Sequence, residues 1–388
     1  MKAKLLILCF LMFTQITLGQ LQYLSEQAEI SVLTIAPGAS LNDAFGHSGF
    51  RVKDTTGLDV VFNYGVYDFE APHFYLKFAQ GKLDYLMGAN RFTDFYTNYV
   101  EENRSIEEQV LNLTQKEKQA LYNYLLNNYK PENRRYKYDF FYDNCATRIK
   151  DVVLLNVSQP ITFNTPEGYT PKTFRSLIQE KLHWNSWGSL GIDIALGAVI
   201  DKQATPEEQM FLPEKIARFF EVAKVGKDRA LIKSDQVLFQ QQESPQTQGF
   251  WSPLLVLSLL AIAILYITYS DFKKQQRSKW LDATLFGITG GIGIFLLLLW
   301  FATDHTATAN NYNLLWAFPL NFWVAFLINK NKVKTWVTKY LKLLLVMLCL
   351  MVVHWISGVQ VFAFTLIPLL LALAVRYVFL ISQLKNTQ

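Results

Sequence analysis

The apolar positions of this chain of 388 residues fall into two blocks of different character. Residues 20–245 mix apolar and polar positions with the periods of ordinary strands and helices, and this length suits one sizeable globular domain. From residue 253 to residue 388, long apolar stretches dominate. A polar stretch rich in Gln and Ser ends the first block, and we take residues 246–252 as the linker. The pattern therefore predicts two domains.

Five apolar stretches in the second block predict membrane helices, because each is near the length that crosses a hydrocarbon core of about 30 Å. They cover residues 253–269, 281–301, 314–328, 341–356 and 359–381. The third stretch is the weakest, since Pro319 and Asn321 interrupt it, and a buried or kinked helix is the alternative there. The second block is thus predicted to be an all-α membrane domain of about five helices.

The first 19 residues have the pattern of a secretory signal peptide. Lys2 and Lys4 precede an apolar run, and small residues up to Gly19 follow it. This run is too short to remain as a membrane span. We expect cleavage near Gly19 and export of residues 20–245.

Charged residues in the loops predict the orientation of the membrane domain. Residues 270–280 and 329–340 are rich in Lys and Arg, whereas residues 302–312 and 357–360 contain neither. By the positive-inside rule the basic loops are cytoplasmic, which agrees with an exported first block. We expect a multi-pass protein of the bacterial inner membrane with its N-terminal domain in the periplasm. The net charge of +5 then requires no nucleic-acid partner, because much of the excess lies in the basic loops.

The cysteines differ in their expected surroundings. Cys9 lies in the signal peptide, and Cys349 lies within an apolar stretch, where we expect a small buried hydrophobic residue. Cys145 is the single cysteine of residues 20–245. An unpaired thiol in an oxidising compartment indicates intermolecular pairing or a reactive role.

The residues around Cys145 favour the reactive role. The aromatic-rich residues 136–141 predict a strand, Asn144 is of a helix N-cap type, and residues 145–155 show helical spacing of apolar positions. The thiol would lie in the first turn of a helix, where unpaired N–H groups favour an anion and lower a thiol pKa. The alternative is a small residue at a tight junction between strand and helix.

A cysteine nucleophile needs a base, and His47 is the best candidate among three histidines. His73 and His183 have aromatic neighbours and fit packing or surface positions. His47 lies in residues 45–52, which predict a strand paired in a hairpin with residues 59–64. The glycines on either side of His47 keep the backbone slim, as a site that admits substrate requires, although a turn histidine would also explain them.

The order of these residues resembles that of the circularly permuted papain-like enzymes of the lecithin:retinol acyltransferase type. In both, a His on one strand is followed by a polar residue on the next strand and by an Asn-Cys pair opening a later helix. The resemblance implies an α+β, circularly permuted papain-like domain with Cys145 as nucleophile, His47 as base and Asn63 as the residue that orients the imidazole. After Cys145 the chain departs from the animal enzymes, which carry an acidic residue and a histidine there.

A closer resemblance is to the Bacteroidota lipoprotein N-acyltransferase family, and it covers nearly the whole mature chain. The residues that carry it are 46–48, 140–148, the later 196–213 and 304–316. It implies a phospholipid acyl donor, a thioester on Cys145 and a diacylated lipoprotein as acceptor. The sequence offers no metal cluster and no phosphate-binding glycine loop, so we expect no cofactor.

Further polar residues are candidates for binding substrate. Some lie near the proposed catalytic residues, and others lie in the external loop of residues 302–312 or directly after it: Ser48, Asn144, Arg148, His305, Asn311 and Asn313. The loop residues would lie under the N-terminal domain and bind a headgroup or an amine. Loop capping and hydrogen bonds at helix ends are the alternative.

Two other functions are compatible with parts of this pattern. The papain-like scaffold supports hydrolysis as well as acyl transfer, so a cysteine peptidase or amidase acting on cell-wall peptides is one. Five spans argue against it, because a wall hydrolase gains little from a bundle that faces lipid. The other is a membrane sensor or assembly factor with an inert thiol.

Overall fold

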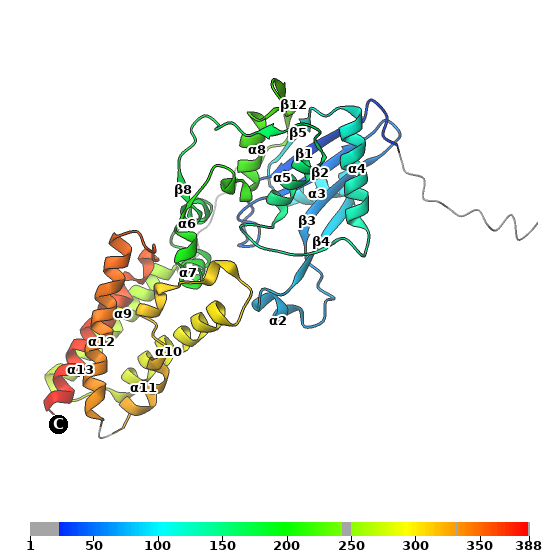
Figure 1. Cartoon of the computed structure of the whole chain (residues 1–388). Coiled ribbons are helices and arrows are strands. Elements are labelled where there is room, and N and C mark those ends of the chain that lie inside the picture. Colours follow the sequence, from blue (N-terminus) through cyan, green and yellow to red (C-terminus); the bar gives the residue numbers. More distant parts are fainter. Residues whose placement is uncertain (1–22, 243–249, 331–332, 387–388) are drawn as a thin grey trace, which may run out of the picture.

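The computed structural model describes residues 23–242, 250–330 and 333–386. Within these ranges a mixed α/β domain is followed by a helical domain, as predicted (Figure 1). The predicted signal peptide, residues 1–19 with Cys9, lies outside the described residues, and so does most of the predicted linker, residues 246–252.

A seven-stranded antiparallel sheet forms the frame of the N-terminal domain, with strand order β12-β5-β1-β2-β3-β4-β6. Its strands are β1 (Glu29–Ile35), β2 (His47–Lys53), β3 (Asp59–Val66), β4 (Asp84–Arg91), β5 (Ile106–Leu111), β6 (Arg135–Lys137) and β12 (Ile232–Phe239). The predicted hairpin is β2 paired with β3. Five two-residue strands lie outside this sheet: β7 (Ile161–Thr162), β8 (Lys172–Thr173), β9 (Gln203–Ala204), β10 (Lys224–Val225) and β11 (Arg229–Ala230).

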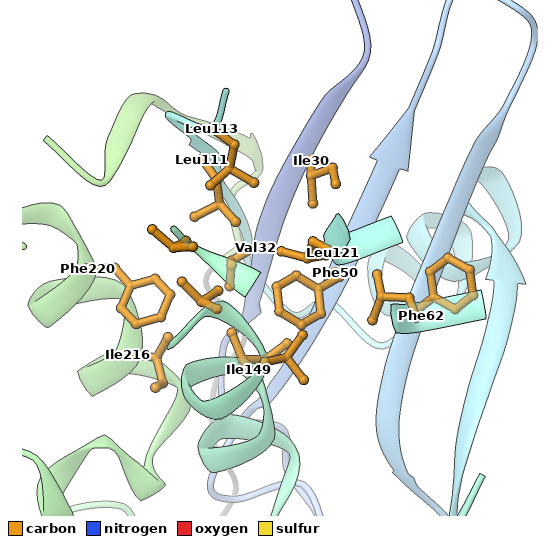
Figure 2. Packing of buried hydrophobic residues seen from close by; sticks show 14 of the residues in the cluster. Ile30, Val32, Phe50, Phe62, Leu111, Leu113, Leu121, Ile149, Ile216 and Phe220 are labelled. Carbon is orange, nitrogen blue, oxygen red and sulfur yellow. The ribbon is translucent and has the colours of Figure 1, made fainter. Parts of the chain in front are cut away.

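Helices cover both faces of the sheet, and the alternation of side chains along the strands explains why. The helices α4 (Gln115–Tyr129), α5 (Cys145–Asn156) and α8 (Pro213–Glu221) share one hydrophobic core with Val32 and Phe50 (Figure 2). Leu33 and Ile35 point the other way, toward Phe95 of α3 (Phe92–Glu101). Figure 2 shows Ile149 of α5 beside Phe50, and burying each such side chain contributes about 1.5–3 kcal/mol.

The strand predicted over residues 136–141 is largely wrong. Strand β6 ends at Lys137, and a turn follows in which the Asp139 carboxylate accepts hydrogen bonds from the N–H groups of Phe141 and Tyr142, at 2.9 and 3.0 Å. An aspartate that bonds backbone groups two and three residues ahead stabilises a turn and competes with strand pairing.

The helical domain contains five helices in the described residues, as predicted: α9 (Pro253–Lys274), α10 (Lys279–Phe301), α11 (Leu320–Ile328), α12 (Thr335–Ile356) and α13 (Ile367–Asn386). Four of them are long and apolar enough to cross a membrane, the last one counted from Phe364 to Lys385. The exception is α11, which is nine residues long and corresponds to the weakest predicted span. It packs closely on α10. The two helices approach so closely that a Cβ at Gly290 would lie 2.0 Å from the Phe322 nitrogen.

Residue Cys349 differs from the prediction, because it is exposed on the outer face of α12. That face is apolar, with Val346 and Val353 exposed beside it. In a bilayer a small apolar residue is as stable against lipid as in a protein core, so apolar sequence alone does not separate the two positions.

The two domains meet through the short helix α7 (Trp187–Ala195) and the 3₁₀ turn η1 (Ala198–Ile200), where the N–H groups of Gly197 and Ala198 donate to the carbonyl oxygens of Ala307 and Asn310. The helix α6 (Phe174–Gln179) and the 3₁₀ turn η2 (Glu208–Phe211) contribute to a hydrophobic cluster against which Ala307 packs. Arg175 is buried here between two carboxylates, with nitrogen–oxygen distances of 3.0 Å to Asp193 and 2.9 Å to Asp201. Asp201 also accepts a hydrogen bond from the N–H of Val361, at 3.1 Å, in the helical domain. A buried ion pair of this kind fixes the joint between the domains.

Candidate active site

The first turn of α5 is fixed by Asn144, which caps the helix as predicted. Its Oδ1 accepts hydrogen bonds from the N–H groups of Ala146 and Thr147, both at 2.9 Å, and the Thr147 hydroxyl accepts from the Asn144 N–H at 2.8 Å. This reciprocal cap starts the helix at Cys145. The thiol therefore lies in the first turn of the helix, beside its backbone N–H groups.

The imidazole of His47 is oriented by Asn63 on the neighbouring strand. The Nε2 atom of His47 lies 3.3 Å from Oδ1 of Asn63, whose Nδ2 donates to Asn90 at 3.3 Å. Gly49 stands directly opposite Asn63 in the β2–β3 register, so no side chain separates the imidazole from the amide. A proton on Nε2 leaves Nδ1 as the basic nitrogen of the ring.

The position of His47 depends on the glycine before it. Gly46 has a φ of +79°, which favours glycine, and a Cβ there would lie 2.6 Å from the carbonyl oxygen of Ile35. Any side chain would push the start of β2 away from β1. Gly46 thus allows the tight entry that puts His47 at the first position of the strand.

The side chains of Cys145 and His47 line one cavity of about 260 Å³, together with Asn63. The N–H of Ser48, the residue after His47, contacts the sulfur closely enough to lower its pKa, as do the N–H groups of Cys145 and Ala146. The fold therefore brings together the three residues that the resemblance implies as nucleophile, base and orienting residue.

Burial decides the protonation states of the pair. It raises the pKa of the Cys145 thiol to about 11, in spite of the N–H groups around the sulfur. Burial also lowers the pKa of His47 to about 4, and the hydrogen bond that Nε2 of His47 donates to Asn63 opposes this shift only in part. The predicted lowering of the thiol pKa is thus wrong, because desolvation of the anion outweighs the helix terminus. At neutral pH the pair is a thiol beside a neutral imidazole.

A second cavity, of about 320 Å³, adjoins the first and is lined mainly by apolar and aromatic side chains. Among the residues that line both cavities are Phe45, Tyr67, Tyr85, Tyr138 and Phe140. The sequence pattern did not predict this cavity. The many aromatic residues in 136–141 indicated an apolar surface, but they did not predict on which face each ring would lie.

Of the other predicted binding residues near the thiol, Asn144 and Arg148 have partners within the protein and the hydroxyl of Ser48 has none among the described residues. Asn144 also donates from Nδ2 to the carbonyl oxygens of Phe140 and Phe211, at 2.7 and 2.8 Å. Arg148 pairs with Asp143 and lies 4.3 Å over the ring of Tyr136. The hydroxyl of Ser48 is fully buried and has no hydrogen-bond partner among the described residues.

The predicted residues of the external loop lie apart from the Cys145 cavity. Asn311 donates to the carbonyl oxygens of Ile194 and Ala195, at 2.8 and 3.0 Å, and Asn313 donates to that of Asp193 at 2.9 Å. Both amides therefore bind the end of α7. They belong to the joint between the domains.

His305 takes another position, because it lines the apolar cavity. Its Nε2 lies 3.2 Å from the carbonyl oxygen of Ala79. The remaining histidines of the N-terminal domain do not line the Cys145 cavity: His73 precedes helix α2 (Phe74–Ala79), and His183 accepts from the N–H of Asn185 at 3.2 Å. In the part of the chain that the structure describes, no three His, Cys, Asp or Glu side chains cluster as metal ligands would.

Two family models match the chain. The model described as the Lnb N-terminal periplasmic domain matches residues 17–180, and the model described as the Lnb transmembrane domain matches residues 245–388. Together they cover well over half of the chain, and the first contains His47, Asn63 and Cys145. No curated protein and no solved structure matches it.

Proposed function

Because this chain belongs to the Lnb lipoprotein N-acyltransferase family, we propose that it moves an acyl chain from a phospholipid to the α-amine of a lipoprotein's lipidated N-terminal cysteine. A thioester on Cys145 is the intermediate. The N-terminal domain works in the periplasm, and the basic loops of the helical domain face the cytoplasm.

The first half of the cycle starts from the neutral pair. The sulfur of Cys145 attacks the ester carbonyl carbon of the phospholipid while Nδ1 of His47 takes the thiol proton. The backbone N–H of Cys145 donates to the oxygen that becomes negative. The bond from the carbonyl carbon to the glycerol oxygen then breaks, and the imidazolium returns its proton to that oxygen. The products are a lysophospholipid and the thioester.

The second half uses the same groups in the opposite direction. The α-amine of the acceptor attacks the thioester carbon, and Nδ1 of His47 takes a proton from the nitrogen. The carbon–sulfur bond breaks, and the proton returns to the sulfur of Cys145. An α-amine has an ordinary pKa of about 7.7–8.0, so part of it is already the neutral nucleophile near pH 7, and His47 has to accept only the proton that the nitrogen loses after its attack. The amide product is more stable than a thioester, which drives the cycle forward.

The observation that carries this proposal is the apolar cavity beside the thiol. Its walls include Ile178, Ile192 and Leu196, and it extends to Ala307 and Thr308 of the loop that follows a membrane-length helix. An acyl chain suits such a cavity, whereas a cell-wall peptide, which is polar, does not.

A labelled phospholipid tests the proposal. The purified full chain is incubated with a phospholipid that carries a fluorescent acyl chain, and the protein is examined for an adduct that hydroxylamine removes. We expect such an adduct on Cys145, and its transfer to a diacylated lipopeptide with a free α-amine.

The same preparation separates the rival functions. Cleavage of cell-wall peptides without any acyl adduct would instead support a cysteine peptidase. If Cys145→Ser leaves lipoproteins with three acyl chains in the host, as mass spectrometry of their N-termini would show, the thiol is not the nucleophile.

A further inference from the structure

Helix α2 (Phe74–Ala79) exposes a large apolar surface for its size. It is six residues long and has no buried residue. Tyr75 is 82% exposed and Leu76 is 57% exposed, and Phe69 just before the helix is exposed as well. An apolar group of this kind on an exposed segment indicates a binding surface.

The contacts of α2 indicate that this surface lies close to the membrane. The carbonyl oxygen of Gln80, next to the helix, accepts a hydrogen bond from the N–H of Asp304 at 2.8 Å. Asp304 is three residues beyond Phe301, the last residue of the membrane-length helix α10. Three residues span about 11 Å at most, so this contact lies close to the end of the hydrocarbon core. Figure 1 shows α2 outside the sheet, on the side of the helical domain.

Two further contacts involve the same loop: one binds the end of α2, and the other joins strand β6 to Asp304. Nε2 of His305 lies 3.2 Å from the carbonyl oxygen of Ala79, and the Lys137 ammonium lies 2.6 Å from the Asp304 carboxylate. The end of α2 is thus bonded to the loop that follows α10, and Phe301 at the end of α10 is exposed as well. The segment is tied to the membrane end of the molecule from both domains.

Aromatic rings connect α2 to the cavity of Cys145. Phe74 lies 6.1 Å from Tyr67, Tyr67 lies 4.9 Å from Tyr85, and Tyr85 stacks on Tyr138 at 4.2 Å, each between ring centroids. The last three line both cavities, and Phe78 of α2 lines the apolar one. The helix therefore has one side toward the apolar cavity and another side exposed.

We infer that α2 lies in the outer leaflet of the bilayer, with Tyr75 and Leu76 in contact with lipid, and forms the entrance by which a phospholipid acyl chain reaches the apolar cavity. The second half of this inference rests on the proposed function.

A fluorescent label at residue 76 tests the position of α2 without any reaction. Leu76→Cys is made together with Cys145→Ser and Cys349→Ser, labelled with an environment-sensitive dye and placed in phospholipid nanodiscs. The matched control is Val237→Cys on the edge strand β12, because Val237 is also 57% exposed. We expect blue-shifted emission at residue 76, quenched by spin-labelled lipid, and neither effect at residue 237.

Two outcomes of this measurement would overturn the inference. If the label at residue 76 emits as it does in water, α2 is not in the bilayer. If the emission is blue-shifted but spin-labelled lipid leaves it unchanged, protein covers the helix, for instance a second copy of the chain. Because Cys145 is absent from these variants, either result is independent of the proposed function.

An activity measurement tests the entrance. Leu76→Asp should lower the rate of Cys145 acylation by bilayer phospholipid about tenfold, because it removes the burial of one leucine in lipid. A short-chain phospholipid below its micelle concentration should show a smaller loss, and Val237→Asp should show none. Equal rates for Leu76→Asp and Val237→Asp would refute the entrance. A wild-type chain that forms no adduct with either lipid would refute the proposed function, while the label still decides where α2 lies.

Discussion

The Cys145 cavity and the external loop of residues 302–312 both contain the polar residue types that bind substrates, but their polar atoms have different partners. In the cavity, Nδ1 of His47 has no hydrogen-bond partner among the described residues, and the groups that bond to the thiol are backbone N–H groups. In the loop, Asn311 and Asn313 donate to carbonyl oxygens of α7, and Asp304 pairs with Lys137.

This difference distinguishes residues that can take part in catalysis from residues that stabilise the fold. A catalytic group must keep a lone pair or a proton available for the substrate, whereas a structural group in a buried place must have its hydrogen bonds made within the protein. Residue type does not distinguish the two cases, because an asparagine can serve either. The partners of each atom do.

The largest expected effect comes from removing the nucleophile. Cys145→Ser should lower acyl transfer to the lipopeptide by about 10³-fold or more, because a buried hydroxyl is a far weaker nucleophile than the thiol. The other cysteine of the described residues supplies the control, since Cys349→Ser on the exposed face of α12 should leave the rate unchanged. Comparable losses in both variants, measured by mass spectrometry of the product, would contradict a special role for Cys145.

Removing the base should have the next largest effect. His47→Gln should lower the rate of acyl-enzyme formation by roughly 10²–10⁴-fold, the usual contribution of a general base. With a pKa of about 4, wild-type His47 is neutral above that pH, so the wild-type rate should fall only as the pH drops toward 4. His73→Gln is the control. An acid limb near pH 6.5 would show that the imidazole is solvated.

The protonation state of the thiol can be measured by alkylation. With a pKa of about 11, only about 10⁻⁴ of Cys145 is ionised at pH 7, so iodoacetamide should modify it far more slowly than a free cysteine. The rate should rise about tenfold per pH unit up to that pKa. Fast alkylation at neutral pH, followed by peptide mass spectrometry, would show instead that a thiolate–imidazolium pair exists before substrate binds.

A substitution at the external loop should lower the stability of the protein. Asn313→Ala leaves the carbonyl of Asp193 and the indole N–H of Trp316 without their partner, and should cost roughly 1–3 kcal/mol of the free energy of unfolding. Thermal unfolding followed by tryptophan fluorescence measures this loss. If the melting temperature stays the same but the transfer rate falls a hundredfold, the loop binds substrate and the contrast between the two regions is lost.

Asn63 should show the smallest effect. Asn63→Ala removes one neutral hydrogen bond to His47 and should slow acylation roughly 2–10-fold. The same bond raises the pKa of His47, so the variant's acid limb should move to lower pH. A shift to higher pH, in a profile of rate against pH, would mean that the alanine admits water to the imidazole.

Local patterns were sufficient for much of the fold. The cap at Asn144, the β2–β3 hairpin and four membrane-length helices depend on the nearest residues along the chain, and the sequence predicted each of them. The order of His47, Asn63 and Cys145 along the chain likewise carried the family resemblance. For these features, the hydrogen bonds and the hydrophobic period lie within one or two elements.

Only the tertiary structure decided the electrostatics and the cavities. The first turn of α5 predicted a low thiol pKa, but the desolvation that raises it comes from α5 packing against β2 and β3, elements far apart in sequence. The turn at Asp139 replaced a strand for which the aromatic pattern was suitable. The ring of Tyr138 lines both cavities, together with residues that lie far from it in the sequence, such as Phe45 and Tyr67. Burial and cavities depend on contacts between residues that are far apart in the sequence, and the pattern of neighbouring residues does not predict these contacts.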